Sequence, residues 1–189
     1  IHHWKADGLD LSPIFASKKM GTELNMRRTT HQDHELENHF DFPHIESAAP
    51  ALREGTPFTI EAEINNTQQA IGTMLGNELT QRWGEQGLNP DTLQLKLSGH
   101  AGQSIGAFVP RGMKITVVGD CNDYVGKGLS GGTIVVRPPD GAGFIASENV
   151  IAGNVIGYGA TSGKIFLNGI VGERFLVRNS GVTAVVEGV

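Results

Sequence analysis

Cysteine is almost missing from this chain, and Cys121 is its only representative. A single thiol cannot build an internal disulfide framework, and such sparse use of cysteine is typical of a reducing compartment, so we expect a cytoplasmic protein. Long hydrophobic runs are also missing, because no stretch approaches the ~20 apolar residues that cross a bilayer. The polar start, Ile1-His2-His3-Trp4-Lys5, has no apolar core of a signal peptide. We therefore expect no membrane association.

Positive charge is scarce as well. The 15 lysines and arginines are outnumbered by 20 aspartates and glutamates, which gives a formal net charge of −5. No stripe of basic residues follows any segment, so nucleic acid is not an expected partner. The length of 189 residues suits one domain, or one domain plus an arm. Because the chain opens on Ile1 and stops at Val189 directly after a strand-like run, we interpret it as a fragment of a longer protein.

Glycine is abundant, with 26 residues, and 21 of them lie from Gly84 onward. Between the glycines lie five short strand-like runs: 95–99, 115–119, 134–138, 165–169 and 183–187. Their starts are 20, 19, 31 and 18 residues apart. A repeated spacing of this kind predicts structural units stacked on one another. The one long interval contains the turn-forming stretch 138–143, which indicates an inserted loop.

The repeated runs predict the fold class, because strand positions two apart share a face. Two ladders of equivalent positions result, of which nine members in ten are apolar: Leu95, Ile115, Ile134, Ile165, Thr183 and Leu97, Val117, Val136, Leu167, Val185. Burying each apolar side chain would stabilise the fold by roughly 1.5–3 kcal/mol. Glycine permits the sharp corners between runs. We therefore predict a mainly β protein: a right-handed, single-stranded parallel β-helix (solenoid) with an N-terminal arm and one covering helix.

The predicted domains divide near residue 56. Residues 1–56 have weak periodicity and are interpreted as an arm or linker, and residues 57–189 as the β-helix domain, truncated at its C-terminal end. Alternation over 57–65 predicts a half-buried strand. Apolar residues at helical spacing predict a helix from Thr67, its N-cap, to Trp83, where Gly84 stops it. We expect this helix to cover the open edge of the first strand.

Histidines suggest a possible metal site. His31, His34, His39 and His44 lie near Asp33, Glu35 and Glu37. Zinc needs three or four converging ligands of fixed geometry, and no cysteine joins this group. A solvated polar arm is the favoured interpretation, and a metal module centred on His31, Asp33 and His34 is the alternative.

Two glycine-rich stretches resemble phosphate-binding loops only superficially. A dinucleotide-binding loop needs a helix after it, whereas Gly99–Gly106 is followed by another strand-like run. Gly126-Lys127-Gly128 lacks the hydroxyl residue of a P-loop. Both stretches are interpreted as structural corners.

Cys121 lies between Asp120 and Asp123, and a thiol nucleophile would need a nearby base. His100, one repeat earlier, is the candidate base, but a packed cysteine is favoured. Asn122 and Asp123 are typical turn residues. We expect Arg174 and Arg178 to form surface or interface ion pairs with Glu173 or a partner. The sequence thus predicts no catalytic, cofactor-binding or metal-binding residue.

Four longer motifs resemble one known family: 102–108, 119–132, 158–163 and 172–181. They look like the C-terminal glycine-repeat (GXGXG) domain of glutamate synthase large subunits, strongly over residues 56–189. The linker before that domain is similar to Gly8–Pro13. The resemblance implies that the complete enzyme makes L-glutamate from L-glutamine and 2-oxoglutarate. It also implies an amidotransferase domain and a barrel with FMN and an iron–sulfur cluster, neither of which this chain matches.

The resemblance implies a scaffolding domain that is not catalytic by itself, inside a parent oxidoreductase of nitrogen assimilation. Its expected partners are the amidotransferase and FMN-barrel domains of the parent chain. A subunit of a formylmethanofuran dehydrogenase-like oxidoreductase is similar in repeat and remains an alternative. A self-associating module is another, because exposed backbone groups at an end of the stack can recruit a second chain.

Overall fold

The structure is a computed structural model, and it describes residues 3–16 and 27–189. It divides into two compact units, Ile1–His34 and Glu35–Val189. The described part of the first unit contains a 3-10 helix η1 (Trp4–Ala6) and a short helix α1 (Ser12–Phe15). No helix in the described residues is long and apolar enough to span a membrane.

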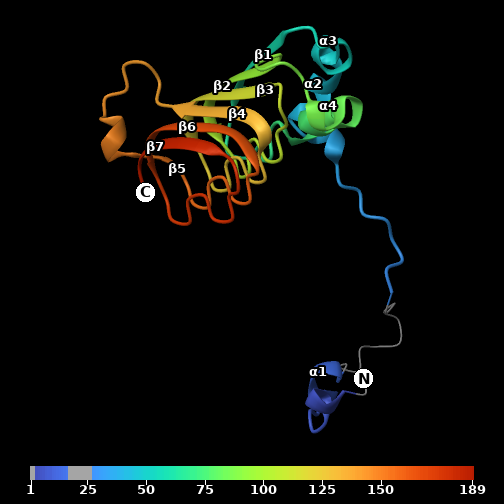
Figure 1. Ribbon diagram of the computed structural model, residues 1–189. Helices are drawn as coiled ribbons and strands as arrows, with labels where there is room; N and C mark the ends of the chain where they lie inside the picture. Colours follow the sequence, from blue (N-terminus) through green and yellow to red (C-terminus); the bar gives the residue numbers. More distant parts are fainter. Residues whose placement is uncertain (1–2, 17–26) are drawn as a thin grey trace. The chain divides into compact units, whose positions relative to one another are not determined.

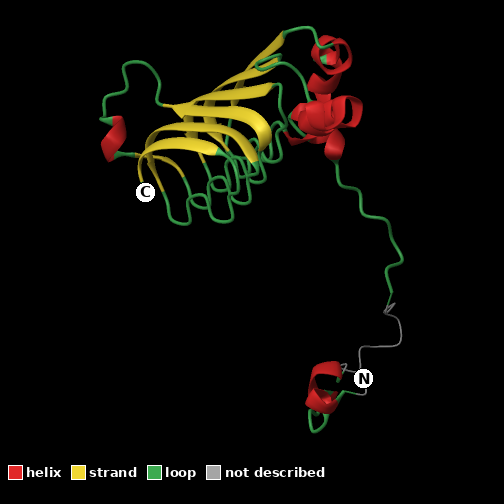
Figure 2. Cartoon of the chain, in the orientation of Figure 1, coloured by secondary structure: helices red, strands yellow, loops and turns green. Residues whose placement is uncertain are grey.

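The second unit is built on one sheet of parallel strands (Figure 1; Figure 2). Within the described residues the sheet has seven strands: β1 (Phe58–Ile64), β2 (Leu93–Ala101), β3 (Met113–Cys121), β4 (Ser130–Arg137), β5 (Val150–Ala152), β6 (Ser162–Val171) and β7 (Thr183–Gly188). Strands β1, β2, β3, β4 and β6 lie side by side in that order. β7 pairs with β6, and the short β5 pairs with β6 and with the end of β3.

The register of the sheet confirms most of the predicted ladders. Leu95 pairs with Ile115, Ile115 with Ile134 and Ile134 with Ile165, and none of the four side chains is exposed. The second ladder, Leu97, Val117, Val136 and Leu167, is equally regular and at most 3% exposed. The aligned aliphatic runs therefore form the centre of the core.

The predicted position of the last run is wrong by one residue. Ile165 pairs with Ala184 rather than Thr183, and Leu167 pairs with Val186 rather than Val185. A slip of one residue moves every side chain to the other face of a strand, and Val185 is accordingly 57% exposed. The adjacent valines made the two faces of this strand indistinguishable in the sequence.

The predicted fold class, a right-handed single-stranded parallel β-helix, is wrong. The described strands make one parallel sheet, accompanied by helices, so the unit is a mixed α/β structure. Equivalent positions on stacked units lie next to each other in any parallel sheet. The spacing of about 20 residues therefore predicted which strands pair, but not the form of the return path, the segment that leads from the end of one strand to the start of the next. That path is made of turns with several residues in the left-handed region, among them Gly106, Gly126 and Gly157, and glycine adopts this conformation at little cost.

The return turns lie side by side on one side of the sheet (Figure 2). Backbone hydrogen bonds join each turn to the next: the amide of Tyr124 donates to the carbonyl of Asn154 at 2.9 Å, and the amide of Val155 donates to Glu173 at 2.9 Å. Bonds in the opposite direction join the interior positions, as from the amide of Gly157 to the carbonyl of Val125 at 2.8 Å. Hydrogen bonds therefore connect successive turns as well as successive strands.

Three helices pack together at the β1 end of the sheet (Figure 1). They are α2 (Asp41–Ser47), α3 (Ala49–Glu54) and α4 (Thr73–Trp83), with short 3-10 helices η2 (Leu36–Asn38) and η3 (Gly84–Gln86) beside them and η4 (Ala146–Glu148) in the inserted loop. The indole of Trp83 donates to the carbonyl of Leu52 at 2.8 Å and ties α4 to α3. Residues 35–56, interpreted from the sequence as part of an arm or linker, carry α2 and α3, and Ala51 and Leu52 of α3 belong to the core.

The helix after β1 begins six residues later than predicted, at Thr73 rather than Thr67. The backbone amide and hydroxyl of Thr67 both donate to the side-chain oxygen of Asn65, so Thr67 belongs to a turn. The cap of α4 comes instead from Asp41, far away in sequence. Its carboxylate accepts from the backbone amides of Gly72 at 2.8 Å, Met74 at 2.9 Å and Leu75 at 3.3 Å.

Candidate functional site

The structure gives contacts for His39 and His44, two of the four histidines considered for a metal site. No group of three or more His, Cys, Asp or Glu side chains among residues 3–16 and 27–189 could hold a metal ion. The ring of His39 bonds through Nε2 to the carbonyl of Gln69 at 2.8 Å and accepts at Nδ1 from the amide of Asp41 at 3.1 Å. The ring of His44 contacts that of Phe40, with centroids 4.7 Å apart. These two histidines therefore position the helices.

Cys121 is buried at the end of β3, as the favoured interpretation predicted. Burial, with a smaller contribution from the charge of Asp120, raises the pKa of the Cys121 thiol far above its ordinary value. His100 instead bonds through Nδ1 to the carboxylate of Asp120 at 2.7 Å, on an exposed surface. A thiol that stays protonated and has no base cannot act as a nucleophile.

The two glycine-rich stretches are turns between strands. Residues 102–108 lead from β2 into β3 without a helix, and residues 122–129 lead from β3 into β4. In the second turn the ammonium of Lys127 lies 5.6 Å from the centre of the Tyr124 ring. Both segments agree with the structural interpretation of the sequence.

A basic hollow lies over three successive turns. It has a volume of about 510 Å³ and is lined by two tyrosines, two valines and three cationic residues: Tyr124, Lys127, Val155, Tyr158, Arg174, Val177 and Arg178. The described residues that line it include no carboxylate. Lys127, Arg174 and Arg178 take part in none of the ion pairs of the described chain, so the expected pairing with Glu173 does not form. Pairing with a partner stays a prediction.

The backbone under two of these arginines has an unusual conformation. Arg174, Leu176 and Arg178 have φ values of +62°, +57° and +58°. The two preceding turns place glycines at positions equivalent to Leu176 and Arg178, namely Gly126 and Gly128, then Gly157 and Gly159. The turn after β2 holds Phe108 at the position of Arg178 with a φ of +59°, and Tyr124 and Val155 share the positive φ of Arg174. This conformation therefore recurs through the turn stack and does not single out the two arginines.

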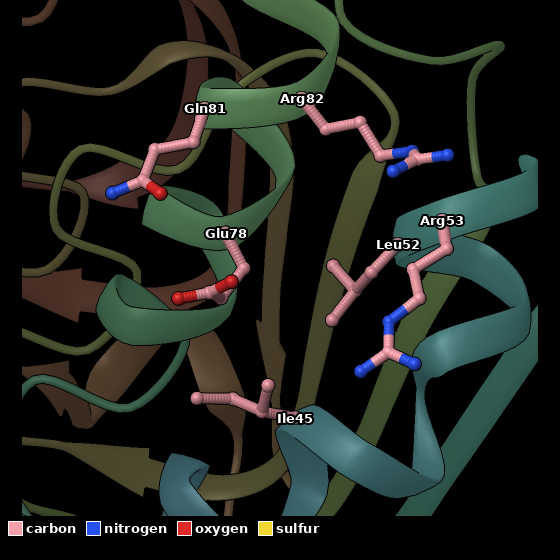
Figure 3. Close-up of a pocket in the computed structure, with 6 residues that line it drawn as sticks. All are labelled: Ile45, Leu52, Arg53, Glu78, Gln81 and Arg82. Carbon is pink, nitrogen blue, oxygen red and sulfur yellow. The ribbon is translucent and has the colours of Figure 1, made fainter.

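A second hollow, of about 310 Å³, lies among the three helices (Figure 3). Its side chains come from α2, α3 and α4 and are Ile45, Leu52, Arg53, Glu78, Gln81 and Arg82. Arg53 pairs with Glu46 at 3.2 Å on the exposed surface, where such a pair contributes little. This set offers polar and apolar contacts but no nucleophile paired with a base.

Asp41 is the important residue that the sequence analysis missed. It is fully buried although charged, and it holds the first turn of α4 from 31 to 34 residues away. Desolvation raises the pKa of the Asp41 carboxyl, against the lowering effect of the three amides and of His39. No local pattern marks such a long-range cap; only the low solvent exposure of a carboxylate in the folded chain does.

Fold and site together define a class of domain in which parallel strands are connected by stacked glycine turns and the interior is filled with aliphatic side chains. The GXGXG motif family matches residues 41–189, and the chain belongs to this family.

The chain is similar to glutamate synthases over most of its length. It is 47% identical over 188 residues to the glutamate synthase [NADPH] large chain of Bacillus subtilis, covering 99% of this chain and 12% of that protein. The corresponding Azospirillum brasilense large chain is 48% identical over 183 residues, which cover 96% of this chain and 12% of that protein. Glutamate synthase [NADH] of Schizosaccharomyces pombe is 47% identical over 179 residues, which cover 95% of this chain and 8% of that protein. The chain thus spans about a tenth of the length of these relatives and matches their glycine-repeat domain.

Proposed function

We propose that this chain is a scaffolding domain of a glutamate synthase large chain and is not catalytic by itself. The observation that carries the proposal is the interior. The ladder from Leu95 to Ile165 is fully buried and continuous through β2, β3, β4 and β6, and bonded turns connect these strands. A filled interior of this kind gives a rigid body, which suits a domain that holds others in position.

The parent enzyme in this proposal converts L-glutamine and 2-oxoglutarate to L-glutamate and carries FMN and an iron–sulfur cluster outside this chain. The donor set of this chain does not fit a cluster, because iron–sulfur clusters take cysteine thiolates and Cys121 is single and buried. The amidotransferase and FMN-barrel domains are the proposed partners. A cytoplasmic location is part of the proposal, in keeping with one free cysteine.

The test is a substitution that disrupts this domain inside the full-length enzyme. Val136→Asp would place an unpaired carboxylate in the core, whereas Val185→Asp makes the same change at a side chain that is 57% exposed. Limited proteolysis shows whether the substitution has unfolded only this domain, because an unfolded domain is cleaved faster than the rest of the enzyme. We expect Val136→Asp to abolish glutamate formation while some glutaminase activity remains, and Val185→Asp to keep both.

Two results would contradict the proposal. One is full glutamate synthase activity in an enzyme whose glycine-repeat domain has become protease-sensitive. The other is glutaminase or glutamate-forming activity in the purified 189-residue chain.

A further inference from the structure

The basic hollow gathers three cationic side chains, and neither the packing of the core nor the proposed scaffold role requires them there. Its cations come from different turns, Lys127 from the turn after β3 and Arg174 and Arg178 from the turn after β6. The chain as a whole has a net charge of −5, so this gathering of unpaired positive charge is a local property of the turn stack.

The composition of the hollow is that of a protein interface. Tyrosine and arginine are the residue types that dominate binding energy in interfaces, and here they line the hollow together with Val155, which is buried, and Val177. Arginine forks bind carboxylates with two parallel hydrogen bonds, and tyrosine hydroxyls can donate a further one. The complementary surface is a polypeptide segment with several carboxylates around an apolar side chain.

We propose that this hollow docks an acidic segment of the longer protein to which the chain belongs, outside the 189 residues. The relatives are roughly eight to twelve times as long as the aligned region, so most of such a protein lies outside this chain. The inference rests on the scaffold proposal and gives one of its contacts a place and a chemistry.

Site-specific photocross-linking in the full-length protein tests the inference. Val177 is replaced by p-benzoylphenylalanine, the protein is irradiated, and the attached peptide is identified by mass spectrometry. We expect a peptide rich in Asp and Glu, and a yield that falls as salt is raised. The double variant Arg174→Glu/Arg178→Glu should lower the yield at least about tenfold, because it places like charges opposite each other.

A matched control makes the same change of charge elsewhere. Lys96→Glu/Arg53→Glu alters two exposed cations outside the hollow, and the yield should stay within about twofold of the parent. Glutamate replaces arginine without new backbone strain, since both carry a Cβ. Absence of a cross-link, a cross-linked peptide without Asp or Glu, or equal yields in both double variants would overturn the inference. None of these outcomes depends on enzyme activity, so the scaffold proposal can survive them.

Discussion

Replacing Asp41 with alanine is the sharpest test of how the helices are fixed to the sheet. The change removes a fully buried carboxylate and leaves the amides of Gly72, Met74 and Leu75 without their acceptor. Each buried donor left unsatisfied costs about 1–3 kcal/mol, and relief of the carboxylate's own burial offsets part of the sum. We expect a loss of about 2–5 kcal/mol in the free energy of unfolding.

Urea denaturation of the 189-residue chain measures this loss by linear extrapolation. Asp41→Asn keeps one acceptor oxygen and should cost less than the alanine variant. Glu46→Ala is the matched control, because Glu46 lies on the same helix, is 82% exposed in its side chain and forms an exposed ion pair with Arg53. Its effect should stay within about 0.5 kcal/mol. An Asp41→Ala variant as stable as the control would refute the capping role.

The same carboxyl predicts a pH dependence. Burial raises the pKa of Asp41 above its ordinary value of 3.8, so the folded chain binds this proton more tightly than the unfolded chain. The resulting contribution to stability is fully present below pH 3.8 and is lost as the pH rises through the raised pKa. The stability of wild type relative to Asp41→Asn should therefore fall with rising pH over this range. A difference that grows with pH would mean that the amides and His39 outweigh burial.

Three further predictions concern the core and the turns. Val136→Asp should prevent folding of the chain, because it buries an unpaired charge, and a soluble variant with an unchanged melting temperature would contradict this. Gly119→Ala should destabilise the protein by at least ~3 kcal/mol, because Gly119 has a φ of +150° and an added Cβ would collide with the carbonyl of Gly99. The control is Gly143→Ala, whose Cβ would meet nothing within 4 Å and whose effect should stay within ~0.5 kcal/mol. Thermal denaturation measures both changes. Cys121 should react with a thiol reagent only when the chain unfolds, because it is buried and its pKa is raised; rapid labelling of the native protein would count against this.

The sequence predicted the pairing of strands better than the fold around them. Ile115, Ile134 and Ile165 fall at equivalent positions because aliphatic residues recur at a constant spacing, and hydrophobic burial fixes the register wherever one face is buried. At β7 the pattern loses its alternation, and the prediction failed there by one residue. The sheet's return path was also missed, because periodicity reports which residues stack and not how the chain comes back.

The basic hollow and the buried cap could not be predicted for a different reason. Arg174 and Lys127 lie 47 positions apart, and only the stacking of turns brings them to one surface. Asp41 caps α4 across a gap of 31 to 34 residues in the sequence. Contacts between distant segments depend on the completed fold, and neither composition nor local spacing carries that information.

The long interval between β4 and β6 has a consequence for how chains of this kind can vary in length. The extra residues lie in the loop 138–149, directly after β4, while the hydrogen bonds between successive turns continue without a gap. At Gly141 and Gly143 an added Cβ would meet no heavy atom within 4 Å, so there is open space beside this loop. A peptide inserted between Gly126 and Gly128 would break bonds in two directions. We therefore expect insertions in the loop 138–149 to be tolerated better than insertions in the hydrogen-bonded turns.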